Sequence, residues 1–125
     1  MTALVDTSVV VDALRGDEAA VDTMIERRQD GPLHASRITL VEVLAGMRPA
    51  EEPRTRELLA TLTWHPLSDE VAEEAGRLGR RWLPSHSGID TADLVVAATA
   101  RVLGVLLLTR NVRHFPMFDG LRPPY

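Results

Sequence analysis

The chain has 125 residues, 45% hydrophobic and 26% charged, with a formal net charge of −4, which predicts one globular domain over residues 1–125. All 14 basic residues are arginine and there is no cysteine. The absence of lysine excludes a lysine-dependent phosphate loop and a Schiff-base lysine. The absence of cysteine excludes a disulfide, a thiolate nucleophile and a zinc site with sulfur ligands. The acidic balance argues mildly against a protein that coats DNA.

Short apolar runs alternate with segments of helical periodicity in the first half of the chain. Apolar runs predict buried strands, and apolar residues at helical spacing predict helices. In chain order we expect a strand at 3–5, a short helix over 8–14, a helix over 18–28, a strand at 33–35, a helix over 38–47 and a helix over 53–62.

The second half continues the alternation. A strand at 63–67 should lie near a sheet edge because it contains Pro66, and the next helix begins at Ser68 or Asp69 and ends near Trp82, with a Glu73–Arg77 pair on its exposed face. We then expect a buried helix over 90–103, a central strand at 105–109 covered on both faces, and a loop-like tail with a last strand near 121–122.

Strands separated by helices predict an α/β fold, a three-layer α/β/α sandwich with a central, mainly parallel sheet. In such sheets ligands bind outside the carboxyl ends of the strands, near the point where the strand order reverses. Asp6 and Thr109 are the first polar residues after two apolar strands. The expected site therefore lies around these two residues.

Asp6 and Glu42 are the first two candidate catalytic acids. Asp6 follows a strand, where either a catalytic carboxylate or a helix cap (Asp6 or Thr7) is expected. Glu42 is the only charge in the helix over 38–47, and an ionised carboxylate in an apolar helix costs several kcal/mol or so unless it is paired. The alternative is a capping box with Thr39, although Ser36 offers an earlier cap.

Asp90 and Asp93 open the helix over 90–103 and lie on the same side of it. Their spacing is also that of a capping pair, and acids in a first turn interact favourably with the helix dipole. Asp93 directly precedes an apolar run, deeper than a dipole acid needs to be. Function and capping therefore both remain open for these residues.

Carboxylates that converge at one edge of a sheet would form an all-oxygen, negatively charged pocket. Such ligands suit Mg²⁺, with Mn²⁺ as a substitute, and the cluster would repel itself without a cation. A hydrated Mg²⁺ can bind a phosphate and activate a water. The chemistry predicted is metal-assisted phosphodiester hydrolysis, with Arg110 and Arg113 as candidate phosphate-binding residues beside the site.

Four segments in order along the chain resemble PIN-domain nucleases, and at this length the similarity is greatest to the VapC toxins of bacterial toxin–antitoxin pairs. The segments are Leu4-Val5-Asp6-Thr7-Ser8, then Ser36-x-x-Thr39-x-x-Glu42, then Asp93-Leu94-Val95-Val96-Ala97-Ala98-Thr99-Ala100, and finally Leu107-Leu108-Thr109-Arg110-Asn111-Val112-Arg113-His114-Phe115. Each segment is a weak signal alone, and four in register over nearly the whole chain are a strong one.

The resemblance implies an Mg²⁺-dependent endoribonuclease in which Asp6, Glu42 and Asp93 match the three core acids of the family. Asp6 and Asp93 would bind the metal directly, and Glu42 would hold a metal-bound water or a second metal. Where the family often has a fourth acid, this chain has Asn111 and His114, which can offer an amide oxygen and an imidazole nitrogen. Asp90, one helical turn from Asp93, could substitute for the missing acid.

The family also implies an RNA substrate, a small antitoxin whose segment enters the active-site groove, and a homodimer. The N-terminus meets the acid Asp6 too early for a signal peptide, and no apolar run approaches the roughly 18 residues of a membrane span. We therefore expect a cytoplasmic protein with no membrane partner. The alternative function is a PIN-like module that binds RNA or a partner and is catalytically weak or inactive.

Overall fold

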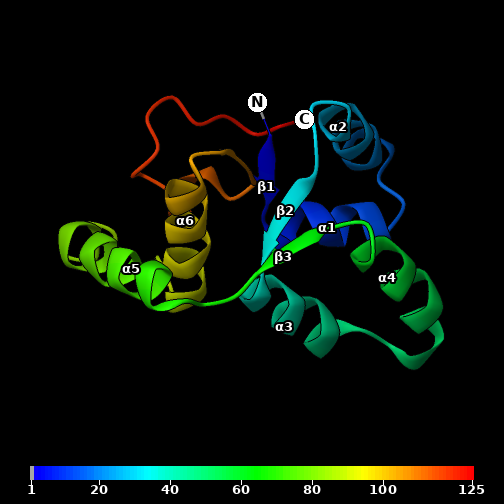
Figure 1. The fold of residues 1–125 in the computed structure, drawn as a ribbon, viewed down its shortest axis with the longest axis horizontal. Coiled ribbons are helices and arrows are strands. Elements are labelled where there is room, and N and C mark those ends of the chain that lie inside the picture. Colours follow the sequence, from blue (N-terminus) through cyan, green and yellow to red (C-terminus); the bar gives the residue numbers. More distant parts are fainter. Residues whose placement is uncertain (1) are drawn as a thin grey trace.

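The computed structural model describes residues 2–125 and contains a parallel sheet with helices on both faces (Figure 1). Within those residues the strands are β1 (Ala3–Val5), β2 (Leu33–Ser36), β3 (Thr63–His65) and β4 (Leu106–Leu108), in the order β3-β2-β1-β4. Every neighbouring pair is parallel, with Leu4 opposite His34 on one side and Leu107 on the other. The predicted α/β sandwich with a parallel sheet is confirmed.

Alternate residues of β1 enter two separate cores. Ala3 and Val5 join the core beneath α1 (Thr7–Leu14), α2 (Glu18–Arg28) and α4 (Glu52–Leu59), whereas Leu4 joins the core beneath α5 (Asp69–Trp82) and α6 (Thr91–Leu103). Helix α3 (Arg37–Gly46) follows β2 and contacts both α1 and α6 (Figure 1). Helix α3 thus links the two helical layers at the carboxyl end of β2.

Local sequence explains where several helices begin and end. Ser68 caps α5 by accepting a hydrogen bond from the N–H of Val71, and Ser36 caps α3 by accepting one from Ile38. Gly104 ends α6 in the left-handed conformation, with φ of 68°, which favours glycine. A single 3-10 turn at Pro49–Glu51 precedes α4, and another at Val112–His114 follows β4.

Three sequence expectations about the fold are wrong. Strand β4 is covered on both faces, since Leu107 and Leu108 enter opposite cores, but within residues 2–125 it pairs only with β1 and is an edge strand. An apolar run indicates that both faces of a strand are buried, but it does not indicate whether the strand has a neighbour on each side in the sheet. No strand forms at 121–122 in the described chain, and Arg77 pairs with Glu74 rather than Glu73.

The expected edge position of β3 is confirmed. No helix in residues 2–125 is both long enough and apolar enough to cross a membrane.

Candidate active site

The strand order reverses between β1 and β4, and Asp6 and Thr109 follow these two strands. The N–H of Asp6 donates to the carbonyl of Leu108 at 2.9 Å, which continues the pairing of the strands by one residue. The buried hydroxyl of Thr109 donates to Asp6 Oδ2 at 2.7 Å. The two residues that the topology rule singled out are therefore direct partners.

Asp6 occupies the N-cap position of α1, but its carboxylate is not used as a cap. It is 5% exposed and accepts hydrogen bonds from Thr109 and from the hydroxyl of Ser8, the latter at 3.2 Å. Among residues 2–125 both of these donors bind Oδ2, which leaves Oδ1 available to another ligand. The catalytic alternative for Asp6 thus remains, and side-chain capping of α1 does not.

The expectation that Glu42 is surrounded by apolar side chains is wrong. Helix α3 buries Thr39 and Val43 and leaves Glu42 exposed, along with Val41, which is 60% exposed. Apolar neighbours in the sequence therefore do not surround this carboxylate. Instead the hydroxyl of Thr7 donates to Glu42 Oε1 at 2.7 Å, and the cap of α3 is Ser36 rather than Thr39.

Asp90 and Asp93 form a reciprocal capping box. Asp90 Oδ1 accepts from the N–H of Asp93 at 2.8 Å, and Asp93 Oδ2 accepts from the N–H of Asp90 at 3.1 Å. Asp93 also lies 3.1 Å from Nδ1 of His114. Capping is thus real, but it does not account for the second contact of Asp93.

Burial raises the pKa of Asp93 to about 6, and the negative charge of Asp90 adds to that rise. The hydrogen bond from the N–H of Asp90 and the proximity of His114 act in the opposite direction. The Asp93 side chain is only 12% exposed. A carboxylate held in this way costs free energy when it ionises, and a bound cation would lower that cost.

These residues line one polar cavity of about 570 Å³. Of the residues expected at the site, its lining includes Asp6, Glu42, Asp90, Asp93, Arg110, Asn111 and His114. Arg113 is exposed and lies outside this lining. A larger hollow of about 830 Å³ between α1, α2 and α4 is mainly apolar and contains none of the candidate acids.

One face of α1 contributes site residues that sequence analysis did not select. Ser8, Asp12 and Arg15 line the cavity and lie at positions i, i+4 and i+7 of the helical segment that starts at the carboxyl end of β1. Polar residues at this spacing in an otherwise apolar segment were the available signal. The hydrogen bond that Tyr125 donates to Asp12, at 2.7 Å, had no local signal.

The donor set of the cavity fits a hard divalent cation, because five carboxylates, including that of Asp12, and an amide oxygen line it with no sulfur ligand. The ligands are not preassembled: in residues 2–125 no three Asp, Glu or His side chains lie close enough to hold an ion. Asp6 is held by Thr109, Glu42 by Thr7, and Asp93 by the Asp90 N–H. A cation bound by three of these carboxylates would therefore require side-chain rotation.

Two histidines pair away from the cavity. Nδ1 of His34 on β2 lies 2.8 Å from Nε2 of His65 on β3, two residues beyond Thr63, the residue that pairs with His34 in the parallel register. Burial lowers the pKa of both rings. This pair belongs to the sheet rather than to the candidate site.

The comparisons with known proteins agree with this geometry. A profile of the PIN domain matches residues 3–120. The chain is 43% identical over 123 residues to Ribonuclease VapC19 of Mycobacterium tuberculosis, covering 98% of each chain, and 43% identical over 122 residues to Ribonuclease VapC10 of the same organism, covering 98% of this chain and 92% of the relative. A toxin–antitoxin complex from Klebsiella pneumoniae contains a chain of similar structure, with a TM-score of 0.82, 28% identity and coverage of 99% and 98%.

Proposed function

Because this chain belongs to the PIN-domain family, we propose that it is an endoribonuclease that acts as the toxin of a toxin–antitoxin pair. The reaction is hydrolysis of RNA phosphodiester bonds, and it depends on Mg²⁺, with Mn²⁺ as a substitute. The identity of 43% to two proteins named as ribonucleases, over nearly the full length, supports the activity.

The observation that carries the proposal is the convergence of four acids on one cavity. Asp6 comes from the end of β1, Glu42 from α3, and Asp90 and Asp93 from the start of α6. These elements are far apart in the sequence and meet at the carboxyl edge of the sheet. Asp6 and Asp93 are buried, and the charge of Asp90 opposes ionisation of Asp93. Buried carboxylates of this kind are costly for a module that needs them only for folding.

In the proposed mechanism Asp6 and Asp93 would hold the divalent cation, which would supply Lewis-acid activation of the phosphate and of a water molecule. Thr109 and Ser8 hold Asp6 Oδ2, so the orientation of this carboxylate is set before substrate arrives. Glu42, positioned by the hydroxyl of Thr7, orients the attacking water or binds a second ion.

The segment after β4 has no acid, and its polar residues take other parts. His114 contacts Asp93, and it either donates a hydrogen bond to that carboxylate or, when protonated, balances its charge. Asn111 lines the cavity and offers an amide oxygen. Asp90 supplies a further carboxylate from the N-cap position of α6.

Arginine side chains supply the phosphate contacts. Arg110 and Arg15 line the cavity and are exposed, which suits a backbone phosphate of the RNA. Arg113, outside the lining, would bind a phosphate further along the strand. The net charge of −4 does not oppose this substrate, because divalent cations at the acids offset much of the negative charge where RNA approaches.

The proposed partner is a small antitoxin that inserts a segment into the cavity. The Klebsiella pneumoniae neighbour is a toxin–antitoxin complex, which supports a protein partner of this class. An arginine from that segment would pair with the acids in place of the cation. A homodimer and a cytoplasmic location complete the proposal.

The function is tested by incubating the purified chain with an RNA pool that carries a randomised stretch between a fluorophore and a quencher. We expect cleavage in Mg²⁺, no cleavage in excess EDTA, and recovery when Mg²⁺ or Mn²⁺ is restored. Heat-denatured protein is the control for contaminating nuclease. RNA binding without cleavage in either metal would reject the nuclease and favour the catalytically inactive binding module.

A further inference from the structure

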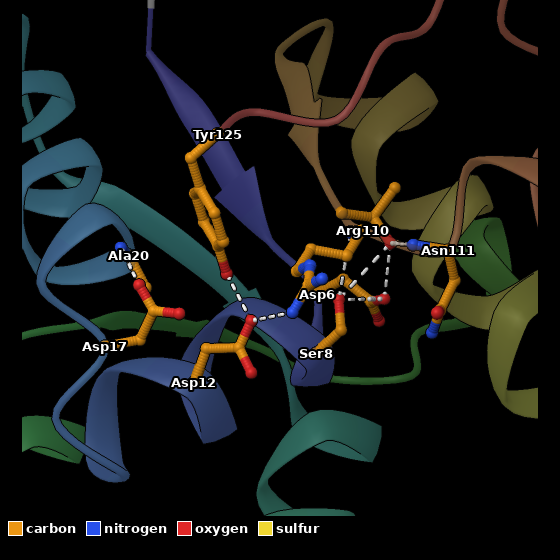
Figure 2. A network of polar contacts seen from close by, with 9 residues as sticks. Asp6, Ser8, Asp12, Asp17, Ala20, Arg110, Asn111 and Tyr125 are labelled. Atoms are coloured by element: carbon orange, nitrogen blue, oxygen red, sulfur yellow. Dashed lines mark hydrogen bonds and ion pairs between the residues drawn. The ribbon is translucent and has the colours of Figure 1, made fainter.

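A polar network joins the acid cavity to the C-terminal residues described, and Arg110 is its centre (Figure 2). The backbone N–H of Arg110 donates to the hydroxyl of Ser8 at 3.1 Å, and Ser8 in turn donates to Asp6. The guanidinium of Arg110 donates to Asp12 Oδ2 at 2.9 Å. The same oxygen accepts the hydroxyl of Tyr125 at 2.7 Å.

The guanidinium is fixed from two sides and remains accessible. It lies 5.7 Å from the centre of the Tyr125 ring, within the range of a cation–π contact. The Arg110 side chain is 52% exposed, whereas that of Asp12 is only 18% exposed. Arginine carries five N–H donors in a rigid fork, so one bond to Asp12 leaves donors for a phosphate.

Helix stability does not explain Asp12. It lies in the last turn of α1, where a negative charge interacts unfavourably with the helix dipole. Although burial alone would raise its pKa, the hydrogen bonds from Tyr125 and Arg110 lower the pKa of Asp12 below its ordinary value. Asp12 is therefore ionised at neutral pH, and its partners lie outside the helix.

We propose that Asp12 and Tyr125 are positioning residues that hold the Arg110 guanidinium at the mouth of the acid cavity, where it binds a phosphate of the RNA next to the one that is cleaved. This inference rests on the proposed function. A free arginine side chain loses rotamer entropy when it binds a phosphate, and an arginine already held in place loses less. Asp12 and Tyr125 thus increase RNA affinity without contacting RNA themselves.

The sign of one substitution separates positioning from simple electrostatics. Asp12 is a negative charge in the cavity lining, and taken alone it repels the RNA backbone. If it does nothing else, Asp12→Asn lowers KM for RNA. If it holds Arg110, the same substitution raises KM, because the guanidinium loses its anchor.

The test is steady-state cleavage of the fluorophore–quencher RNA pool in Mg²⁺ by single and double variants. We expect Asp12→Asn to raise KM about three- to tenfold and Tyr125→Phe about two- to threefold, with kcat changed less than about twofold. Arg110→Ala should raise KM at least as much as Asp12→Asn. Adding Asp12→Asn to Arg110→Ala should raise KM no further, because the anchor then has nothing to hold.

Asp22→Asn is the matched control, because it removes an equal negative charge from an exposed position on α2, and it should leave KM unchanged. A lower KM for Asp12→Asn, or effects of Asp12→Asn and Arg110→Ala that multiply, would overturn the positioning of Arg110. Fluorescence anisotropy on the same RNA separates this inference from the nuclease itself. If the variants lose RNA affinity as expected but no protein cleaves RNA, the nuclease is rejected and the positioning of Arg110 stands. If the variants cleave RNA with an unchanged KM, the positioning of Arg110 is rejected and the nuclease stands.

Discussion

An Asp6→Asn protein should fold as the parent does and cleave RNA at least about 100-fold more slowly in Mg²⁺. The substitution keeps the shape of the side chain and an oxygen that can accept the hydroxyl of Thr109. It removes the charge that a directly bound cation needs. The measurement is the initial cleavage rate of the RNA pool, with circular dichroism and urea unfolding as checks of the fold.

The matched control for Asp6→Asn is Asp22→Asn, which removes an equal charge from an exposed position on α2. This control should cleave at the parental rate. A folded Asp6→Asn protein that cleaves RNA as fast as the parent would show that Asp6 is a structural residue at the end of β1.

Asp93→Asn should also abolish cleavage, and it should make the metal-free protein more stable at pH 7 by about 1–3 kcal/mol. Burial and the neighbouring Asp90 raise the pKa of Asp93 from 3.8 to about 6 in the folded chain. The folded state therefore binds a proton more tightly than the unfolded state does. Parental stability should rise as the pH falls from about 6 to about 4, and the Asn variant should lack this contribution.

Urea unfolding in EDTA across this pH range, with the variant curve subtracted from the parental one, measures the effect. The subtraction removes the contribution of His34 and His65 to the pH dependence of stability. The lowered pKa values of these two rings favour unfolding as the pH falls below about 6.5, which is the opposite direction to the effect of Asp93. If Asp93 serves only as half of the capping box, the two curves run parallel and Asp93→Asn is destabilising at every pH.

Local pattern predicted most elements of the fold because their signals lie within single segments. The bounds of β1 at Ala3–Val5 and α2 at Glu18–Arg28 match the expected ranges, and the cap of α5 is one of the two residues proposed. The order of the strands in the sheet had no signal within any single segment. Strand β4 has the composition of a central strand because helices and the C-terminal segment cover both faces, although only β1 lies beside it.

The candidate site was predictable where residues follow strand ends or match family segments, as Asp6 and Thr109 do. For Glu42 the expected location was right and the physical reason was wrong, because the apolar side chains around it in sequence do not enclose it in space. The Arg110–Asp12–Tyr125 network joins residues 98 and 113 positions apart. Contacts of this range depend on how the tail returns to α1, which no local periodicity reports.

The carboxylates of Asp6, at the end of β1, and Asp93, on α6, are proposed to bind one divalent cation together. Anomalous diffraction from crystals of the protein soaked in Mn²⁺ locates that ion directly. We expect an anomalous peak within ligand distance, about 2.0–2.3 Å, of carboxylate oxygens of both Asp6 and Asp93, and no peak there in Asp6→Asn crystals. A peak away from both carboxylates, or a cavity that stays without Mn²⁺ while the protein cleaves RNA, would contradict it.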